Sequence, residues 1–229
     1  MRLLQSLLCD ARTIQSKDPA ARTLAEVVLL YPGFHVLIFY RAAHLLYRRK
    51  HLFLARAVSQ LGRFCTGIEI HPGATVGQGL FIDHGAGIVI GETAEIGDNV
   101  TIYHGVTLGG TGKDKGKRHP TIGDNVLIGT GAKVLGPIKI GANSRIGSNS
   151  VVLRDMPSNA TIIGIPARAV RINGEKVAYH DSENLNQRDY PDIVSAELAG
   201  LARREVELSK RLAAVERRLS QASQEEEPS

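Results

Sequence analysis

The sequence predicts an α+β protein in which an N-terminal helical domain, residues 1–62, precedes a parallel β-helix, residues 63–170, and a tail, residues 171–229. Three observations support this division. Apolar residues recur at helical spacing in the first part, every six positions in the middle, and at heptad spacing near the end. Each period is typical of one architecture: an amphipathic helix, a β-helix built from six-residue repeats, and a coiled-coil helix.

The first segment predicts several helices. Apolar side chains repeat at three- and four-residue spacing, as at Val36, Phe39, Tyr40, Ala43 and Leu46. The pair Pro32–Gly33 predicts a break between two of the helices. Asp18 followed by Pro19 predicts another helix start, with the aspartate as the cap and the proline in the first turn.

An aliphatic residue recurs every six positions through the middle of the chain, and we call each six-residue unit a hexad. The recurring positions are Ile70, Val76 and Ile82, then Ile90, Ile96, Ile102 and Leu108, then Ile122, Ile128, Val134, Ile140, Ile146 and Val152. This period fits neither a helix nor a hairpin meander. It indicates a parallel β-helix in which three short strands and three turns make one coil of about 18 residues.

Two interruptions of the period predict irregular corners. Eight residues lead from Ile82 to Ile90, two more than a hexad, and fourteen lead from Leu108 to Ile122, eight more than a hexad. The second surplus lies within "GGTGKDKGKRHP", which we expect to protrude as a loop. Counting hexads places His84 and His104 on adjacent coils of one face, about 4.8 Å apart.

The tail contains a polar stretch and then a predicted helix. Its apolar residues follow heptad spacing at Leu198, Leu201, Leu208, Leu212, Val215 and Leu219. Two interpretations stay open, a short coiled coil or an amphipathic helix that lies on its own subunit. The final "ASQEEEPS" is polar and acidic, and we expect it to be disordered.

Composition favours a cytoplasmic, soluble protein. Hydrophobic residues make up 43% of the chain, yet no apolar run approaches the roughly 20 residues of a membrane span. The apolar stretch at the N-terminus is too short for a signal peptide. Two distant cysteines, Cys9 and Cys65, argue against a disulfide framework. The net charge of +5 comes without a nucleic-acid-binding motif, which favours an anionic small molecule over nucleic acid as the partner.

The pair Asp83–His84 lies between two glycine-rich apolar runs and is the candidate reactive site. A histidine held by a carboxylate is a competent general base near neutral pH, and Glu69 is the candidate partner. Arg118, at the foot of the expected loop, carries a guanidinium that can grip a carboxylate bidentately. Three more histidines lie within the same fifty residues, namely His71, His104 and His119.

Three stretches, "DHGAGIVIGETA", "GVTLGGTGKDKGKRHPTIGDN" and "GIPAR", closely resemble the bacterial serine O-acetyltransferases. With "KDPAAR" in the helical part, the resemblance covers residues 14–171. It implies a left-handed β-helix and trimers with active sites between neighbouring subunits. It also implies transfer of an acetyl group from acetyl-CoA to the L-serine hydroxyl, giving O-acetyl-L-serine and CoA, the first step of cysteine biosynthesis from serine.

The resemblance also implies a role for individual residues. His84 matches the catalytic base, with direct transfer and no acyl-enzyme, and Glu69 matches the carboxylate paired with that base. Asp18 and Asp83 match the groups that hold the serine ammonium, whereas the groups that hold its carboxylate match Arg118 and His119. Acetyl-CoA is expected as a co-substrate near Gly110, Thr130, Ala132 and Arg145. No metal and no permanently bound cofactor are expected.

Partners follow from the same resemblance. L-cysteine is an expected feedback inhibitor. A homotrimer is expected, because the helical region is short beside members that use a long N-terminal extension to pair their trimers; a dimer of trimers stays open. Some members insert a C-terminal isoleucine into O-acetylserine sulfhydrylase, but this chain ends in Ser229. We therefore expect little or no complex by that route.

Several alternatives stay open or are disfavoured. A γ-type carbonic anhydrase needs a paired-histidine zinc pattern that is missing here, and the amino-acid-gripping residues argue against acetylation of a sugar or drug. Intact His84 and Arg118 argue against an inactive scaffold. His104 either tunes His84 or, as we favour, is a neutral corner residue. The loop lysines either meet the CoA phosphates or solvate the loop: Lys113, Lys115 and Lys117.

Overall fold

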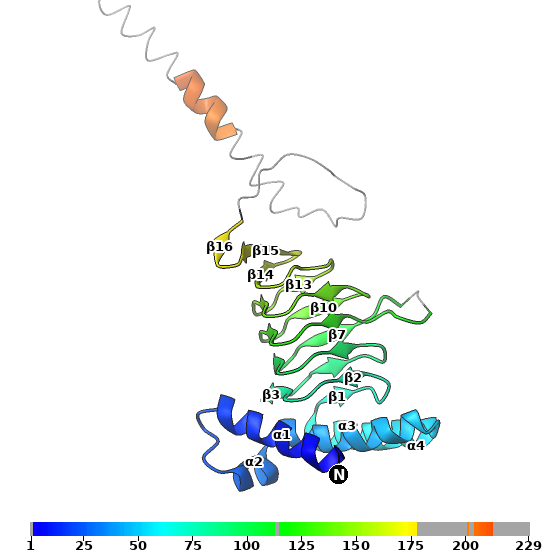
Figure 1. The fold of residues 1–229 in the computed structure, drawn as a ribbon. Helices are drawn as coiled ribbons and strands as arrows, with labels where there is room; N and C mark the ends of the chain where they lie inside the picture. Colours follow the sequence, from blue (N-terminus) through cyan, green and yellow to red (C-terminus); the bar gives the residue numbers. More distant parts are fainter. Residues whose placement is uncertain (1, 113–114, 178–200, 202–203, 213–229) are drawn as a thin grey trace, which may run out of the picture. The chain divides into compact units, whose positions relative to one another are not determined.

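A computed structural model of the chain describes residues 2–112, 115–177, 201 and 204–212, in two units, Met1–His180 and Asp181–Ser229. The first unit begins with helices and continues as stacked coils of β-structure (Figure 1). Its helices are α1 (Arg2–Lys17), α2 (Leu24–Leu30), α3 (Pro32–Arg48) and α4 (Leu52–Thr66). The predicted architecture, a helical domain followed by a parallel β-helix, is confirmed, and α4 continues past position 62.

The helix breaks follow local chemistry. As predicted, α2 and α3 are separate, with Pro32 at the first turn of α3 and a bend of 70° between them. The predicted helix start at Asp18 is wrong: α2 begins at Leu24, and its cap is Thr23, whose hydroxyl accepts from the Glu26 N–H. Asp18 instead accepts from the Ala20 N–H, and such a side-chain-to-backbone turn competes with a helix start. Within the described residues no single helix is long and apolar enough to cross a membrane. The bent α2–α3 pair reaches the necessary length and apolar composition only when its two helices are taken together.

Short strands build the β-helix, and they pair in three sheets. The first contains β1 (Glu69–Ile70), β4 (Val89–Ile90), β7 (Thr107–Gly109), β10 (Lys133–Leu135) and β13 (Val151–Val152). The second contains β2 (Thr75–Val76), β5 (Glu95–Ile96), β8 (Thr121–Ile122) and β11 (Lys139–Ile140). The third contains β3 (Phe81–Asp83), β6 (Thr101–Tyr103), β9 (Leu127–Ile128), β12 (Arg145–Ile146), β14 (Ala160–Gly164), β15 (Ala167–Ile172) and β16 (Glu175–Lys176).

The register confirms the hexad count. On the third sheet the parallel pairs join Ile82 to Ile102, Ile102 to Ile128, and Ile128 to Ile146. All four side chains are buried in one continuous core. Only β14–β15 and β15–β16 pair antiparallel among the described strands, which closes the stack with a hairpin.

Two corners of the prism carry the candidate site residues. The histidine corner, residues 84–88, 104–106 and 130–132, turns from the third sheet to the first. The loop corner, residues 71–74, 91–94, 110–112 and 115–120, turns from the first sheet to the second. As predicted, the segment between β7 and β8 projects from the side of the stack (Figure 1).

The helices are fastened to the first coils by buried polar contacts. Asp10 of α1 accepts hydrogen bonds from Arg41 of α3 (3.2 Å) and from the Gly79 N–H (2.9 Å). The Tyr40 hydroxyl donates to the Ala74 carbonyl at 2.7 Å, and the Ser59 hydroxyl donates to the Ile70 carbonyl at 2.8 Å. The helices are therefore a specific cap on one end of the β-helix.

The second unit contributes one short helical stretch, residues 204–212, with residue 201 also helical. Its apolar side chains are exposed in the single chain, including Leu201, Leu208 and Leu212. Leu198, Val215 and Leu219 lie outside the described residues, as does the end of the chain. The coiled coil therefore stays a prediction.

Candidate functional site

His84 follows β3 in an unusual backbone conformation. Its φ of 58° lies in the left-handed region, and the Gly85 N–H donates to the Asp83 carbonyl at 2.7 Å. A residue with a Cβ in this region carries local strain. The two surplus residues after Ile82 accommodate this tight turn, and the turn leaves the imidazole 78% exposed.

His104 lies beside His84 on the next coil, as the hexad count predicted. The pairing of Asp83 with Tyr103 aligns the two strands, and the two rings meet edge to face with centroids 5.9 Å apart. Both side chains are exposed at the histidine corner. The arrangement places a second imidazole within one coil of the candidate base.

Carboxylates gather where the helical cap meets β3. The Tyr31 hydroxyl donates to Asp18 at 2.8 Å. Burial first, then the hydrogen bond and charge of Asp18, and then the charges of Glu26 and Asp83 raise the pKa of Tyr31 to about 12. The negative charges of Asp18 and Asp83 thus both raise the pKa of the Tyr31 hydroxyl, which places the two carboxylates in one neighbourhood. Two carboxylates so placed suit an ammonium group.

Glu69 has a different partner from the predicted one. Its carboxylate forms an ion pair with Arg63 of α4 at 3.1 Å. Among the described residues, the carboxylate paired with His84 is that of Asp83, with 4.0 Å from Oδ1 to Nε2, too long for a hydrogen bond. Nevertheless the chain around Glu69 adjoins the histidine corner, because the Gly87 N–H donates to the Gly67 carbonyl.

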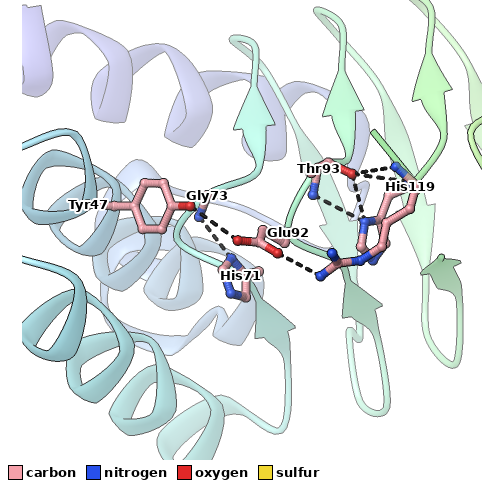
Figure 2. Close-up of polar contacts among 7 residues, drawn as sticks. Tyr47, His71, Gly73, Glu92, Thr93 and His119 are labelled. Carbon is pink, nitrogen blue, oxygen red and sulfur yellow. Dashed lines mark hydrogen bonds and ion pairs between the residues drawn. The ribbon is translucent and has the colours of Figure 1, made fainter. Parts of the chain in front are cut away.

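Arg118 is held at the loop corner by the carboxylate of Glu92, which Figure 2 labels. Its guanidinium is 2.6 Å from one oxygen of Glu92, and the Tyr47 hydroxyl donates to the other oxygen at 3.2 Å. Burial opposes ionisation of Glu92, but His71, Tyr47 and Arg118 together hold the pKa of its carboxyl below the usual value. This network links α3 to the foot of the loop.

His119 is 8% exposed at the same corner and contacts Thr93. Burial first, and then the charge of Arg118, lowers the pKa of the His119 imidazole. The ring lies against glycines: a Cβ at Gly91 would collide with it, and a Cβ at Gly110 would lie 3.0 Å from Nε2. Gly110 therefore adjoins both residues predicted to hold the serine carboxylate, Arg118 and His119.

The structure brings only some of the predicted acetyl-CoA residues together. Thr130 and Arg145 line one pocket of about 330 Å³ on the third sheet. Ala132 is buried in the core, so only its backbone is available to a ligand. Gly110 lies at the loop corner instead. Of the loop lysines, Lys117 pairs with Glu95 at 2.9 Å, and Lys113 lies outside the described residues.

The candidate residues thus form two groups on different corners. Asp83 and His84 lie at the histidine corner, with Asp18 linked to Asp83 through Tyr31, and Arg118 and His119 lie at the loop corner; β4 runs between the two corners. In the described part of the chain, no three His, Cys, Asp or Glu side chains are grouped to hold a metal ion.

Sequence reasoning missed Tyr31, Tyr47, Glu92 and Thr93 as members of these groups. Glu92 and Thr93 belong to the stretch "GETA", and their place at a corner follows from the hexad count. That count would have put them beside the foot of the loop. The tyrosines come from the helical cap, whose docking the period does not describe.

Comparisons with known proteins agree with this architecture. Residues 119–154 match the family model "Bacterial transferase hexapeptide (six repeats)". The fold and its corners thus define a hexapeptide-repeat acyltransferase. The serine acetyltransferase of Bacillus subtilis (strain 168) is 55% identical over 212 residues, which cover 93% of this chain and 96% of that protein. The chain belongs to the serine acetyltransferase family, and it is an acyltransferase.

Other relatives and solved structures agree. The serine acetyltransferase of Helicobacter pylori (strain J99) is 64% identical over 157 residues, 69% of this chain and 92% of that protein. The crystal structure of the Neisseria gonorrhoeae serine acetyltransferase has a TM-score of 0.73 at 40% identity and covers 78% of this chain and 67% of that chain. Neighbouring serine acetyltransferase structures include complexes with serine and with cysteine.

Proposed function

We propose that this enzyme transfers the acetyl group of acetyl-CoA to the hydroxyl of L-serine, giving O-acetyl-L-serine and CoA, the first step of cysteine biosynthesis. The observation that carries the proposal is the opposite charge of the two corners, in a chain 55% identical to a serine acetyltransferase. L-serine is zwitterionic, so its site needs an anionic and a cationic half. Asp18 and Asp83 supply the first half, and Arg118 supplies the charge of the second, with the His119 ring beside it as a hydrogen-bonding group.

His84 acts as the general base. Its imidazole takes the proton from the serine hydroxyl as that oxygen attacks the thioester carbonyl carbon, so a C–O bond forms and the C–S bond breaks. The proton then passes to the CoA thiolate. The transfer is direct in this proposal, with no acyl-enzyme; the cysteines lie in helices, Cys9 in α1 and Cys65 in α4, and neither has a role in it.

The carboxylate partner of His84 is Glu69 in this proposal. Glu69 must then exchange Arg63, whose side chain is more than half exposed, for His84. His104 remains a corner residue that packs on His84. Holding both substrates in reactive geometry supplies much of the rate, on the order of 7–11 kcal/mol at best.

Acetyl-CoA is a co-substrate in this proposal, and the enzyme needs no permanently bound cofactor. The pocket lined by Thr130 and Arg145 is on the same side as the histidine corner and offers a guanidinium to an anionic ligand. Gly110 and the backbone at Ala132 complete the predicted contacts. Lys117 has to leave Glu95 to meet a CoA phosphate.

Assembly joins the two halves of the serine site. Serine carries its ammonium and carboxylate on one carbon atom, so both must be held close together, yet β4 separates the corners within one chain. A cyclic homotrimer places the histidine corner of one subunit against the loop corner of the next. A dimer of such trimers stays open, and we place the enzyme in the cytoplasm.

The proposal extends to L-cysteine, which carries the same ammonium and carboxylate groups as L-serine, and to the sulfhydrylase as a partner. L-cysteine differs from L-serine at one atom, and a neighbouring serine acetyltransferase structure is a complex with cysteine. We therefore propose that L-cysteine inhibits by occupying the serine site. We propose little or no complex with O-acetylserine sulfhydrylase through Ser229.

The direct test mixes enzyme, acetyl-CoA and L-serine and follows the release of free CoA thiol. Thiol release that requires L-serine, and that fails with galactosides or chloramphenicol-type alcohols, supports the proposal. Equal release with the sugar substrates, or none with L-serine, would contradict it. D-serine is the matched control, since it carries the same groups in the mirror arrangement.

A further inference from the structure

Thr93 makes an unusual number of contacts with the foot of the loop. Its hydroxyl oxygen accepts from the Arg118 N–H at 3.0 Å and from the His119 N–H at 3.1 Å, and lies 2.9 Å from Nδ1 of His119. Its own N–H donates to the same Nδ1 at 3.2 Å (Figure 2). The Lys117 ammonium donates to its carbonyl at 2.8 Å. Thr93 therefore contacts three consecutive residues of the loop.

These contacts determine where the hydrogens lie. A threonine hydroxyl has one hydrogen and two lone pairs. The two backbone N–H groups use both lone pairs, so the hydroxyl hydrogen of Thr93 is left to point at Nδ1 of His119. Nδ1 then accepts from two donors and has no room for a hydrogen of its own. A neutral imidazole in this position must carry its hydrogen on Nε2.

We propose that Thr93 is a positioning residue that holds His119 as the neutral Nε2–H tautomer, ready to donate to the carboxylate of L-serine. This inference rests on the proposed function for the identity of the ligand. The tautomer itself is a property of the free protein. Thr93 acts through His119 and Arg118, and it need not touch the substrate.

The charges around His119 agree with a neutral ring. Arg118 and Lys117 are neighbours on the loop, Glu92 faces the ring from the β4–β5 turn, and His71 faces it from the β1–β2 turn. The cations oppose a further positive charge, and Glu92 favours it but is engaged by Arg118 and Tyr47. Burial is the first cause of the lowered pKa of His119, and the charges of Arg118 and Lys117 add to it.

The opposite ring nitrogen faces the glycines of the loop corner. Among the residues that the structure describes, Nε2 of His119 has no hydrogen-bond partner, and it lies against the bare backbone of Gly91 and Gly110. Arg118 lies at the same corner. A carboxylate placed there meets one guanidinium and one fixed neutral N–H, which gives direction as well as charge.

Nuclear magnetic resonance of the free enzyme tests the tautomer directly. With histidine-selective ¹⁵N labelling, the ¹⁵N chemical shifts distinguish a ring nitrogen without a hydrogen, a ring nitrogen that carries one, and a doubly protonated ring. The His119→Gln variant identifies the His119 signals among those of the eight histidines. The inference expects a hydrogen on Nε2 and a bare Nδ1 at about pH 8, with protonation only below the ordinary value of about 6.5. An Nδ1–H ring, or an imidazolium at about pH 8, overturns it.

Matched variants then test the role of Thr93. Thr93→Val removes the hydroxyl at nearly constant shape, and Thr93→Ser keeps it. In Thr93→Val we expect the pH of half-protonation of His119 to rise and KM for L-serine to increase about three- to tenfold, the range of one neutral hydrogen bond, with kcat within about twofold. Thr93→Ser restores both values. A titration of His119 that is identical in Thr93→Val and the native enzyme overturns the inference.

The two proposals fail separately. If the enzyme does not acetylate L-serine, the spectra of the free protein still report the tautomer of His119. If serine is acetylated but Nδ1 of His119 carries the hydrogen, only the positioning role of Thr93 is lost. A Thr93→Val protein that unfolds leaves the spectrum of the native enzyme as the deciding measurement.

Discussion

The Glu92 carboxylate lies 2.6 Å from the Arg118 guanidinium, and this ion pair fixes the foot of the loop to the preceding coil. The two residues are far apart in sequence, and each is about one-third exposed. Tyr47 of the helical cap donates to the other oxygen of Glu92, so the pair is held from both sides (Figure 2). Arg118 thereby presents its remaining N–H groups in a defined direction.

Replacement of Glu92 tests this relationship. Glu92→Gln keeps the shape but removes the charge, and Arg118 then loses its fixed orientation. We expect KM for L-serine to rise about tenfold, the equivalent of about 1.4 kcal/mol, with kcat within about threefold. Glu95→Gln, which breaks the exposed pair with Lys117, is the matched control and should change KM less than twofold. Equal effects of the two variants would argue against a positioning role for Glu92.

Replacement of His84 tests the general base, and the backbone decides which variant to use. Asparagine tolerates positive φ, and this chain already places it at such corners, as at Asn99, Asn125 and Asn143. We expect His84→Asn to lower kcat about 10²–10⁴-fold while the urea midpoint stays unchanged. His104→Gln should keep most of the activity. If the two variants exchange these phenotypes, His104 is the base.

The six-residue period predicted the β-helix, its register and the stacking of His84 on His104, because each coil repeats the same local geometry. It also predicted that the loop leaves the coil between Leu108 and Ile122. The partner of Glu69 did not follow from the sequence, since Arg63 comes from a helix whose docking has no repeat. For the same reason Tyr31 and Tyr47 were not found.

The start of α2 shows a second limit. Asp18–Pro19 has the composition of a helix start, but the Asp18 side chain binds the Ala20 N–H and the Tyr31 hydroxyl. A tertiary contact from Tyr31 thus competes with the local signal. Thr23, followed three residues later by Glu26, is a capping pair that the sequence contained.

Acid should weaken the fold through His71 and His119. Burial lowers the pKa of both His71 and His119, assisted by Arg56 and Arg118 respectively. In the unfolded chain these histidines take up protons near their ordinary pKa of ~6.5, at a higher pH than in the folded protein. The free energy of unfolding is therefore greatest above pH ~6.5, and it falls as the pH drops through the lowered pKa values of the folded state. Urea midpoints between about pH 8 and about pH 5 measure this. The fall should be shallower in His119→Gln, and an identical slope would contradict the assignment.

The buried pair Asp10–Arg41 should be a main support of the helical cap. The Asp10 side chain is fully buried, and Arg41 also donates to the carbonyls of Val76 and Gly77. Asp10→Ala leaves a buried guanidinium and the Gly79 N–H without that acceptor, and we expect a loss of about 3–5 kcal/mol in the free energy of unfolding. Glu207→Ala, in the exposed pair with Arg211, should cost less than about 1 kcal/mol. If Asp10→Ala lost no more stability than Glu207→Ala, the Asp10–Arg41 pair would not be a main support of the helical cap.

The serine site should consist of the histidine corner of one subunit and the loop corner of the next. Mixing subunits that carry His84→Asn with subunits that carry Arg118→Ala tests this shared site directly. Each variant alone should be nearly inactive, because every site in its trimers lacks one intact half.

An equal mixture, refolded or co-expressed, should recover activity, because about one quarter of the sites in randomly assembled cyclic trimers contain both intact halves. The predicted result is thiol release at about one quarter of the native rate, with acetyl-CoA and L-serine. A mixture whose subunits have exchanged, yet which stays as inactive as the separate variants, would contradict the shared site.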